Sequence, residues 1–227
     1  MDFRELFTRE LLDLNKTIAA AIFEGIKYPW ESLNNIHDFI LCLGSKLPCD
    51  KFEKIGENIW ISKTAQICDT ASLNGPLIID ENAEIRHCAF IRKDVIIGKN
   101  SVVGNSTELK NVILFDNVQV PHYNYIGDSI LGYKAHLGAG AITSNVKSDK
   151  SEVLVCVGSE KIKTGLKKFG AIVGDSTEVG CNTVLNPGTI IGRNSIVYPV
   201  SSVRGMIPEG SIYKSKDNCI KKRPCHF

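Results

Sequence analysis

The sequence predicts a mainly β fold, a coiled parallel β-solenoid, because three features recur in blocks of six residues. An aliphatic or aromatic residue opens each block, the next position often holds Gly, Asn or Asp, and a small side chain stands four positions after the opening residue. Neither the two-residue period of a strand nor the 3.6-residue period of a helix gives a strict six. Because Gly, Asn and Asp tolerate left-handed backbone, each block is predicted to form a short strand and a tight corner, with three sides per turn. The opening residues are Ile61, Ile67, Leu73, Ile79, Ile85, Ile91, Ile97, Val103, Leu109 and Phe115, then Val173, Val179, Leu185, Ile191, Val197 and Val203.

The N-terminal residues 1–55 are predicted to form a helical cap and linker. Helical stripes of apolar residues at 6–22 and 30–40 indicate two helices, and Pro29 between them fits a helix start. Because the ends of a solenoid must be covered, we expect this segment to shield the open first coil. Docking to another copy or to a partner is the alternative role.

The six-residue pattern indicates a solenoid over residues 56–213. The pattern is absent at residues 146–170, where charged residues are frequent, so a loop excursion is expected there. Residues 214–227 form a basic C-terminal tail, which carries Lys214, Lys216, Lys221, Lys222 and Arg223.

Composition and charge narrow the classes of function. The formal net charge of +2 is too small to indicate nucleic-acid binding, and the N-terminus has no apolar run typical of a signal peptide or membrane span. The eight cysteines lack paired CxxC spacing, which favours free thiols in a reducing cytoplasm over disulfides or zinc. Cys219, Cys225 and His226 could in principle hold a metal, but a frayed C-terminus is preferred and no metal site is predicted.

Two cations share one expected corner of the solenoid. If three blocks make one turn, residues 18 positions apart stack on neighbouring coils, about 4.8 Å apart. Arg92 and Lys110 have this spacing, and both follow an opening apolar residue. Two cations at this separation repel each other unless an anion lies between them, and phosphate suits an arginine. The sequence therefore predicts a phosphate site, with two solvated cations as the alternative.

A candidate base lies in the segment PHYNYIGD, where the six-residue pattern slips. Its histidine is His122, and Gly104 is expected one coil below on the same corner, which would leave the imidazole open. An exposed histidine that titrates near neutral pH is suited to general-base catalysis. A structural histidine, or a simple bulge at the slip, is the alternative.

The repeats, together with the segments NSTELKN, PHYNYIGDSILG and HLGAGAITSN, resemble those of hexapeptide-repeat acyltransferases, whose fold is a left-handed parallel β-helix. The chain is similar, over residues 60–216, to the acetyltransferase part of the bacterial bifunctional enzymes that make UDP-N-acetylglucosamine. It is also similar to their archaeal sugar-1-phosphate nucleotidylyltransferase relatives, which KTGLKKFGAIVGD resembles more closely. The nucleotidyltransferase domain has no counterpart here, because residues 1–55 are too short and lack a glycine-rich nucleotide loop. The chain is therefore not expected to make a nucleotide sugar by itself.

The resemblance implies roles for individual residues. His122 would be the base that takes a proton from the amino group of a sugar phosphate, and Asn145 would hold the acceptor and support acetyl-CoA. The implied substrate-binding residues are Arg92, Glu108, Lys110, Tyr125 and His136. The implied cofactor-binding residues are Ala139, Asn145, Val146, Cys181 and Lys216. The chain departs from the bacterial pattern at His136 (Asn in that enzyme), Cys181 (Ser) and Pro199 (Ala), which leaves the sugar open.

The predicted function is N-acetyltransfer from acetyl-CoA to an amino-sugar phosphate, glucosamine-1-phosphate or galactosamine-1-phosphate, or to a UDP-amino sugar. This places the chain in nucleotide-sugar and cell-envelope precursor metabolism. A backbone N–H of the segment GAG at 138–140 would stabilise the oxyanion, and the resemblance implies a homotrimer.

Two alternatives remain open. The first is a non-catalytic subunit that binds a sugar nucleotide or a partner enzyme through the N-terminal segment. The second is a γ-type carbonic anhydrase, which holds zinc with three converging histidines. Only His87, His122 and His136 lie in the solenoid, and they lack the closely spaced pair that such sites use.

Overall fold

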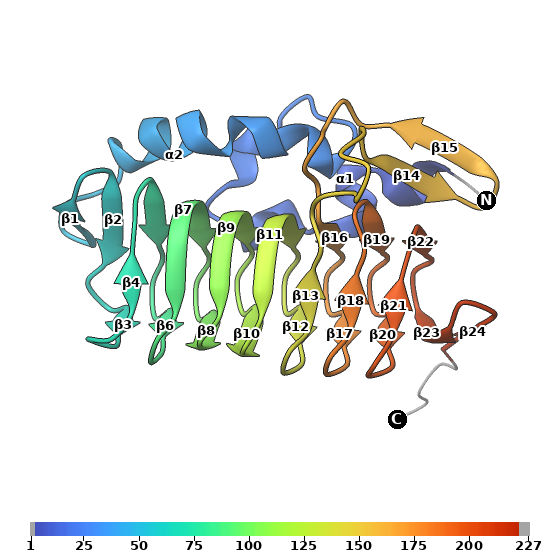
Figure 1. Ribbon diagram of the computed structural model, residues 1–227. Helices are drawn as coiled ribbons and strands as arrows, with labels where there is room; N and C mark the ends of the chain where they lie inside the picture. Colours follow the sequence, from blue (N-terminus) through green and yellow to red (C-terminus); the bar gives the residue numbers. More distant parts are fainter. Residues whose placement is uncertain (1–2, 223–227) are drawn as a thin grey trace.

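The structure is a computed structural model that describes residues 3–222, and it is a parallel β-helix with a helical segment along one side (Figure 1). Helical structure in the described residues precedes residue 45. The α-helices are α1 (Thr8–Leu11) and α2 (Ile36–Gly44), and the 3₁₀ helices are η1 (Phe3–Leu6), η2 (Leu14–Lys16), η3 (Ala20–Phe23) and η4 (Pro29–Asn35). The predicted mainly β solenoid is confirmed.

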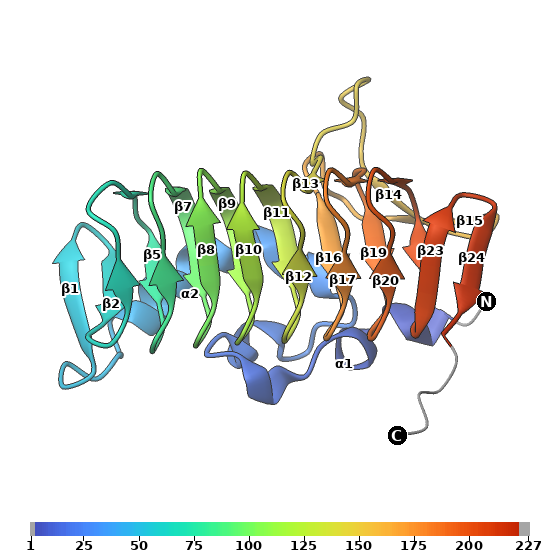
Figure 2. The same ribbon diagram turned by 90° about the horizontal axis from the view of Figure 1, so that it is seen from below.

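The parallel strands form three faces of a prism. The first face has β4 (Ser72–Leu73), the first halves of β7 (Phe90–Ile97), β9 (Glu108–Leu114) and β11 (Tyr125–Leu131), then β13 (Ile142–Thr143), β18 (Val184–Leu185) and β21 (Ser202–Val203). The second face has β2 (Ile59–Ser62), β5 (Leu77–Ile79), the second halves of β7, β9 and β11, then β16 (Ala171–Val173), β19 (Thr189–Ile191) and β22 (Met206–Ile207). The third face has β3 (Gln66–Ile67), β6 (Glu84–Ile85), β8 (Val102–Asn105), β10 (Gln119–His122), β12 (His136–Leu137), β17 (Glu178–Val179), β20 (Ile196–Val197) and β23 (Ser211–Ser215) (Figure 2).

Three antiparallel additions complete the fold. β1 (Phe52–Gly56) pairs with β2 at the start of the solenoid, and β24 (Asn218–Lys221) pairs with β23 at its end. The excursion at 146–170 contains a hairpin of β14 (Leu154–Val157) and β15 (Glu160–Lys163). Arg223, Cys225 and His226 of the predicted tail lie outside the described residues. No helix within residues 3–222 is long and apolar enough to cross a membrane.

The second face is apolar on both sides of its strands. The middle residue of each three-residue stretch on this face points away from the interior by strand alternation, yet Ile78, Ile96, Ile113, Ile130 and Ile172 are fully buried. In this register Leu114, and not the predicted Phe115, takes the inward position beside Ile97. They are covered by the N-terminal segment and the hairpin, since α2 packs on β5, β7 and β9, η4 on β11, and β14 on β19 and β22 (Figure 1). Burial of this extra apolar layer holds the N-terminal segment on the solenoid.

The expected position of the N-terminal segment is therefore wrong. It was predicted to cover the open first coil, but it runs lengthwise over the second face, with Phe23 against Phe115 and Trp30 against Phe169. The first coil is instead covered by β1 and by the end of α2, where Gly44 lies against the Trp60 ring. The segment packs on the second face because the outward residues of that face are apolar.

The spacing between central coils is also shorter than the expected 18 residues. Val95 pairs with Val112 across β7 and β9, although the opening residues Ile91 and Leu109 keep the longer spacing. A register shift after Ile91 absorbs the extra residue, Arg92, so that Lys93 pairs with Lys110. The predicted stacking of Arg92 directly on Lys110 is therefore wrong, although both lie on the first face.

The same shortening moves Gly104 away from its expected partner. His122 pairs with Asn105, and Gly104 lies against Pro121. A Cβ atom built on Gly104 would come 1.6 Å from the Pro121 carbonyl oxygen, so glycine is required by the close approach of two backbones.

We expect Gly104→Ala to lower the free energy of unfolding by more than about 2 kcal/mol, because the methyl group meets fixed backbone on the next coil. The matched control is Gly56→Ala, where a Cβ has its nearest neighbour at an ordinary 3.5 Å. Urea denaturation of both variants checks the register. Equal stabilities of the two variants would contradict it.

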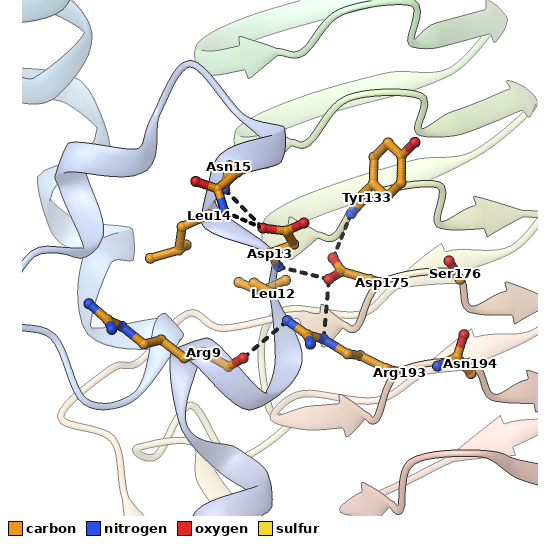
Figure 3. Close-up of a pocket in the computed structure, with 10 residues that line it drawn as sticks. All are labelled: Arg9, Leu12, Asp13, Leu14, Asn15, Tyr133, Asp175, Ser176, Arg193 and Asn194. Atoms are coloured by element: carbon orange, nitrogen blue, oxygen red, sulfur yellow. Dashed lines mark hydrogen bonds and ion pairs between the residues drawn. The ribbon is translucent and has the colours of Figure 1, made fainter.

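A buried carboxylate fastens the N-terminal segment to the edge between the second and third faces (Figure 3). Asp175 accepts hydrogen bonds from the Asp13 N–H (2.7 Å) and the Tyr133 N–H (2.8 Å) and pairs with Arg193 Nε at 3.2 Å. Arg193 in turn donates to the Arg9 carbonyl at 3.0 Å, and the Asp175 N–H donates to Leu11. Burial raises the pKa of the Asp175 carboxyl, and Arg193 and the two amides oppose this rise.

The sign of this pKa shift gives a pH dependence. A carboxyl with a raised pKa in the folded state contributes stability that is present below the unfolded pKa, about 3.9, and is lost as pH rises through the folded value. The stability of the parent protein relative to Asp175→Asn should therefore fall as pH rises above about 4. Urea titrations at a series of pH values measure this difference. The control is Asp149→Asn, where a lowered pKa predicts the opposite slope, and a rising difference for Asp175 would contradict the assignment.

Candidate active site

One edge of the prism, between the third and first faces, carries three of the predicted residues. The edge repeats through backbone hydrogen bonds in which each corner amide donates to the preceding coil: Tyr123 to Asn105 (2.8 Å), Gly140 to His122 (3.0 Å), Asn182 to Ala139 (2.8 Å) and Val200 to Cys181 (2.8 Å). His122, Ala139 and Cys181 therefore occupy the same position on successive coils. We call this column the His122 edge. Because strands lie about 4.8 Å apart, Cys181 is about 10 Å along the edge from His122.

The His122 imidazole is exposed and has no hydrogen-bond partner within residues 3–222. The other three described histidines each have one: His37 with Asp94, His87 with Thr70 and His136 with Glu178, all at 2.7 Å. An unpaired, solvent-facing imidazole is available to accept a proton from a bound ligand.

The backbone of His122 is nevertheless held firmly, by a residue that sequence reasoning missed. Asn124 is buried, and its side-chain oxygen accepts the His122 N–H at 3.1 Å. Its amide nitrogen donates to the carbonyls of Gly138 (2.9 Å) and Ala141 (3.0 Å) on the next coil. Asn124 thus ties the candidate base to the GAG corner. The signal available in the sequence was the position of Asn124 in PHYNYIGD, where the six-residue pattern slips.

A second cluster lies at the far edge of the first face and centres on Asp128, which the sequence analysis also missed. Lys110 Nζ lies 3.0 Å and 3.1 Å from the two carboxylate oxygens, and Asn111 donates to one of them at 2.9 Å. Asn145 donates to the other. The structure therefore brings together two predicted residues, Lys110 and Asn145, through a carboxylate that is almost fully buried. We call these four residues the Asp128 cluster.

Arg92 has its own carboxylate. Its guanidinium bonds Glu108 at 2.9 Å, and the Arg92 side chain remains 46% exposed whereas that of Lys110 is only 16% exposed. Since each predicted cation is already paired with an acid of the same chain, mutual repulsion gives no argument for a phosphate. Lys93, in register with Lys110, is the more exposed neighbour and was not predicted.

Tyr125 lies on the same face, beside the Asp128 cluster. Burial is the main cause that raises the pKa of its phenol, and the charges of Asp128 and Glu108 add to this, so the hydroxyl stays protonated. The hydroxyl lies over Gly127, where a Cβ would come within 2.6 Å of it. The ring therefore offers a hydrogen-bond donor to a ligand on the first face.

The remaining predicted residues lie apart from this face. His136 is on the third face, paired with Glu178, so Tyr125 and His136 lie on opposite sides of the His122 edge. Val146 is exposed and directly follows Asn145. Lys216 lines a groove of about 650 Å³ at the end of the solenoid. Within residues 3–222, no group of three His, Cys, Asp or Glu side chains is placed to hold a metal.

Comparison with known proteins finds relatives that are similar in sequence over most of this chain. A model of the GMPPB C-terminal domain matches residues 73–169. The chain is 32% identical over 220 residues to the bifunctional protein GlmU of Methanococcus maripaludis strain S2, and 34% identical over 221 residues to that of Methanococcus aeolicus. In both cases the match covers 88% of this chain and 49% of the relative. A bifunctional sugar-1-phosphate nucleotidylyltransferase/acetyltransferase of Sulfurisphaera tokodaii is 30% identical over 64% of this chain and 41% of its own length.

The predicted resemblance to the GlmU proteins is confirmed. This chain spans about half the length of these curated relatives. Among solved structures, the N-acyltransferase AntD from Bacillus cereus matches 77% of this chain and 92% of its own, at 17% identity and a TM-score of 0.38. Perosamine N-acetyltransferase from Caulobacter crescentus matches 73% of this chain and 57% of its own, at 14% identity and a TM-score of 0.33.

The Asp128 cluster makes a prediction about stability. Asp128→Asn should cost about 3 kcal/mol, because it leaves the largely buried Lys110 ammonium without its counter-charge. Adding Lys110→Met should cost less than the sum of the single changes, with a coupling of at least about 1 kcal/mol. The exposed pair Arg92 and Glu108 is the control and should couple by less than about 1 kcal/mol. Urea denaturation of the two double-mutant cycles measures both coupling free energies. Equal couplings would contradict the difference in burial between the two ion pairs.

Proposed function

We propose that this chain transfers an acetyl group from acetyl-CoA to the amine of an amino-sugar phosphate or a nucleotide-linked amino sugar. The observation that carries the proposal is the exposed, unpaired imidazole of His122, which shares one edge with Ala139 and Cys181 and faces away from the covered second face. The Sulfurisphaera tokodaii relative supports the class of reaction, because its name couples sugar-1-phosphate nucleotidylyl transfer to acetyl transfer. The seven described cysteines are free thiols, which supports a reducing cytoplasm.

The reaction needs one base and one oxyanion donor. The amine nitrogen attacks the thioester carbonyl carbon, and His122 takes the proton that the nitrogen loses. The C–S bond then breaks, and the departing thiolate receives that proton from His122 and leaves as a free thiol. Among the amides of Gly138, Ala139, Gly140 and Ala141, only the Ala139 N–H lacks an acceptor within residues 3–222. We therefore place the oxyanion at the Ala139 N–H, one coil from the base.

The acceptor is proposed to lie across the first face, between the His122 edge and the Asp128 cluster. These two ends are separated by about three strand residues, roughly 10 Å, which suits one sugar ring and its phosphate. Lys110 has three ammonium donors and Asp128 takes two, so one remains for a ligand. Arg92 and Lys93 are the exposed cations proposed to meet the phosphate, with the Tyr125 hydroxyl as a hydrogen-bond donor and the side-chain oxygen of Asn145 as an acceptor for the sugar. Such anchoring fixes the amine near the acetyl group.

The acetyl-CoA is proposed to lie along the His122 edge toward the end of the solenoid. Cys181 lies on this line, and Lys216 lies close to its end, four coils beyond β10 on the third face. Val146 follows Asn145 at the far edge of the first face and is not on this line. Strand spacing places Lys216 about 19 Å from the strand of His122, within the reach of a long, thin cofactor that ends in phosphates. His136 faces the other side of the edge. It would reach the same acceptor only from a neighbouring copy, which supports an oligomer, and the resemblance to hexapeptide-repeat acyltransferases is the reason that a homotrimer is proposed.

A thiol-release assay tests the proposal on a panel of glucosamine-1-phosphate, galactosamine-1-phosphate and UDP-amino sugars with acetyl-CoA. We expect turnover with at least one acceptor, and His122→Ala should lower kcat/KM by about 10²- to 10⁴-fold because the general base is lost. His37→Gln, on α2, is the matched control and should retain activity.

Two results would overturn the proposal. Retention of most activity by His122→Ala would remove the base assignment. Binding of a UDP-amino sugar in calorimetry, without thiol release from any acceptor, would instead favour the non-catalytic binding subunit.

A further inference from the structure

A second reactive constellation lies at the start of the His122 edge, in the first coils of the solenoid. Cys68 Sγ lies 3.3 Å from the hydroxyl of Thr70, and the same hydroxyl lies 2.7 Å from Nδ1 of His87 on the next coil. His87 occupies the position of His122 two coils earlier, so the two imidazoles are separated by about 10 Å along the edge. The transferase mechanism uses none of these three residues.

The hydroxyl of Thr70 couples the thiol to the imidazole through its limited number of hydrogen bonds. A hydroxyl donates one bond and accepts two, and the Cys88 N–H already fills one acceptor place at 3.2 Å. If the thiol donates to Thr70, the hydroxyl must donate to His87. If His87 Nδ1–H donates to Thr70, the hydroxyl donates to the sulfur of Cys68. A shift of two protons along this chain of hydrogen bonds converts thiol and neutral imidazole into thiolate and imidazolium.

The surroundings of Cys68 leave room for a second molecule. The thiol lines a groove of about 450 Å³ together with Gln66, Glu84, Arg86 and His87. Arg86 is held by both oxygens of Glu84, at 2.8 and 3.0 Å, so its charge is balanced within the groove. The hydroxyl and the N–H of Thr70 lower the pKa of the Cys68 thiol, and burial and the Asp69 carboxylate oppose this.

We propose that Cys68 is a thiol-modification site, at which the thiolate exchanges with small disulfides that enter the groove. The Cys68 proton passes to Thr70 as the hydroxyl proton of Thr70 passes to His87. The thiolate then attacks one sulfur of the disulfide, a new S–S bond forms, and the other half leaves as a thiolate, so no further oxidant is consumed. This site does not depend on the proposed transferase activity.

The seven described cysteines supply internal controls. Cys49, Cys88 and Cys219 are more exposed than Cys68, so access alone would label them first. With limiting dithiobis(nitrobenzoate), we expect one fast phase of thiolate release at neutral pH and a mixed disulfide that peptide mass spectrometry assigns to Cys68. Cys68→Ser should abolish the fast phase, whereas Cys88→Ser, at the same corner, should leave it unchanged.

The relay has its own test. His87→Gln and Thr70→Val should each slow the fast phase by about tenfold, because without the relay a smaller fraction of Cys68 is present as the reactive thiolate. Thr70→Ser keeps the hydroxyl and should restore the rate, and circular dichroism checks that each variant is folded. Labelling of Cys68 no faster than of Cys49 or Cys88 would overturn the site, and an unchanged rate in both relay variants would overturn the activation by His87.

Discussion

The register between successive coils is the constraint on which the rest of the structure depends. Each corner amide of the His122 edge donates a hydrogen bond to the coil before it. Residues at the same position of successive repeats therefore lie in a column along one edge, separated by the spacing of neighbouring strands. This turns distances in sequence into distances in space. His122 and Ala139 are 17 residues apart yet adjacent, and Cys181 joins them although a 25-residue excursion intervenes. The candidate site is a consequence of this register and needs no long-range loop to assemble it.

The second constraint is the unequal burial of the three faces. The strands of the second face carry consecutive apolar residues, so their outward side chains are apolar as well as their inward ones. The N-terminal segment and the hairpin cover these outward side chains and keep them from water. The first and third faces keep polar or partly exposed outward positions such as Glu108, Gln119 and Glu178. The two faces that flank the His122 edge are therefore the ones left open to a ligand or to another copy.

The sequence was sufficient for the repeat, because one inward apolar residue per block is a signal that depends only on local spacing. It was insufficient for the placement of the N-terminal segment, although the signal was present: runs such as LII at 77–79 and VII at 95–97 are apolar on both sides of the strand. The bulge at Arg92 was not predictable from a fixed spacing of 18, because the extra residue is present in β7 and has no counterpart in the paired strand β9. Asp128 was missed because its role depends on residues of the two flanking coils, Lys110 and Asn111 on one and Asn145 on the other, whose convergence appears only in the folded register.

The two ion pairs of the first face differ in burial, and this difference gives them different roles in the proposed site. Asp128 is buried and accepts hydrogen bonds from three side chains. If an external anion took these donors, the Asp128 carboxylate would be left buried without partners, which costs a large free energy. The pair of Arg92 and Glu108 is far more exposed, and an exposed pair is worth little, so in the proposed function a phosphate would replace Glu108 at Arg92 with little loss. The two pairs therefore have different roles. Asp128 sets the positions of Lys110 and Asn145 before any ligand arrives, and Arg92 is the cation that can change partner when one does.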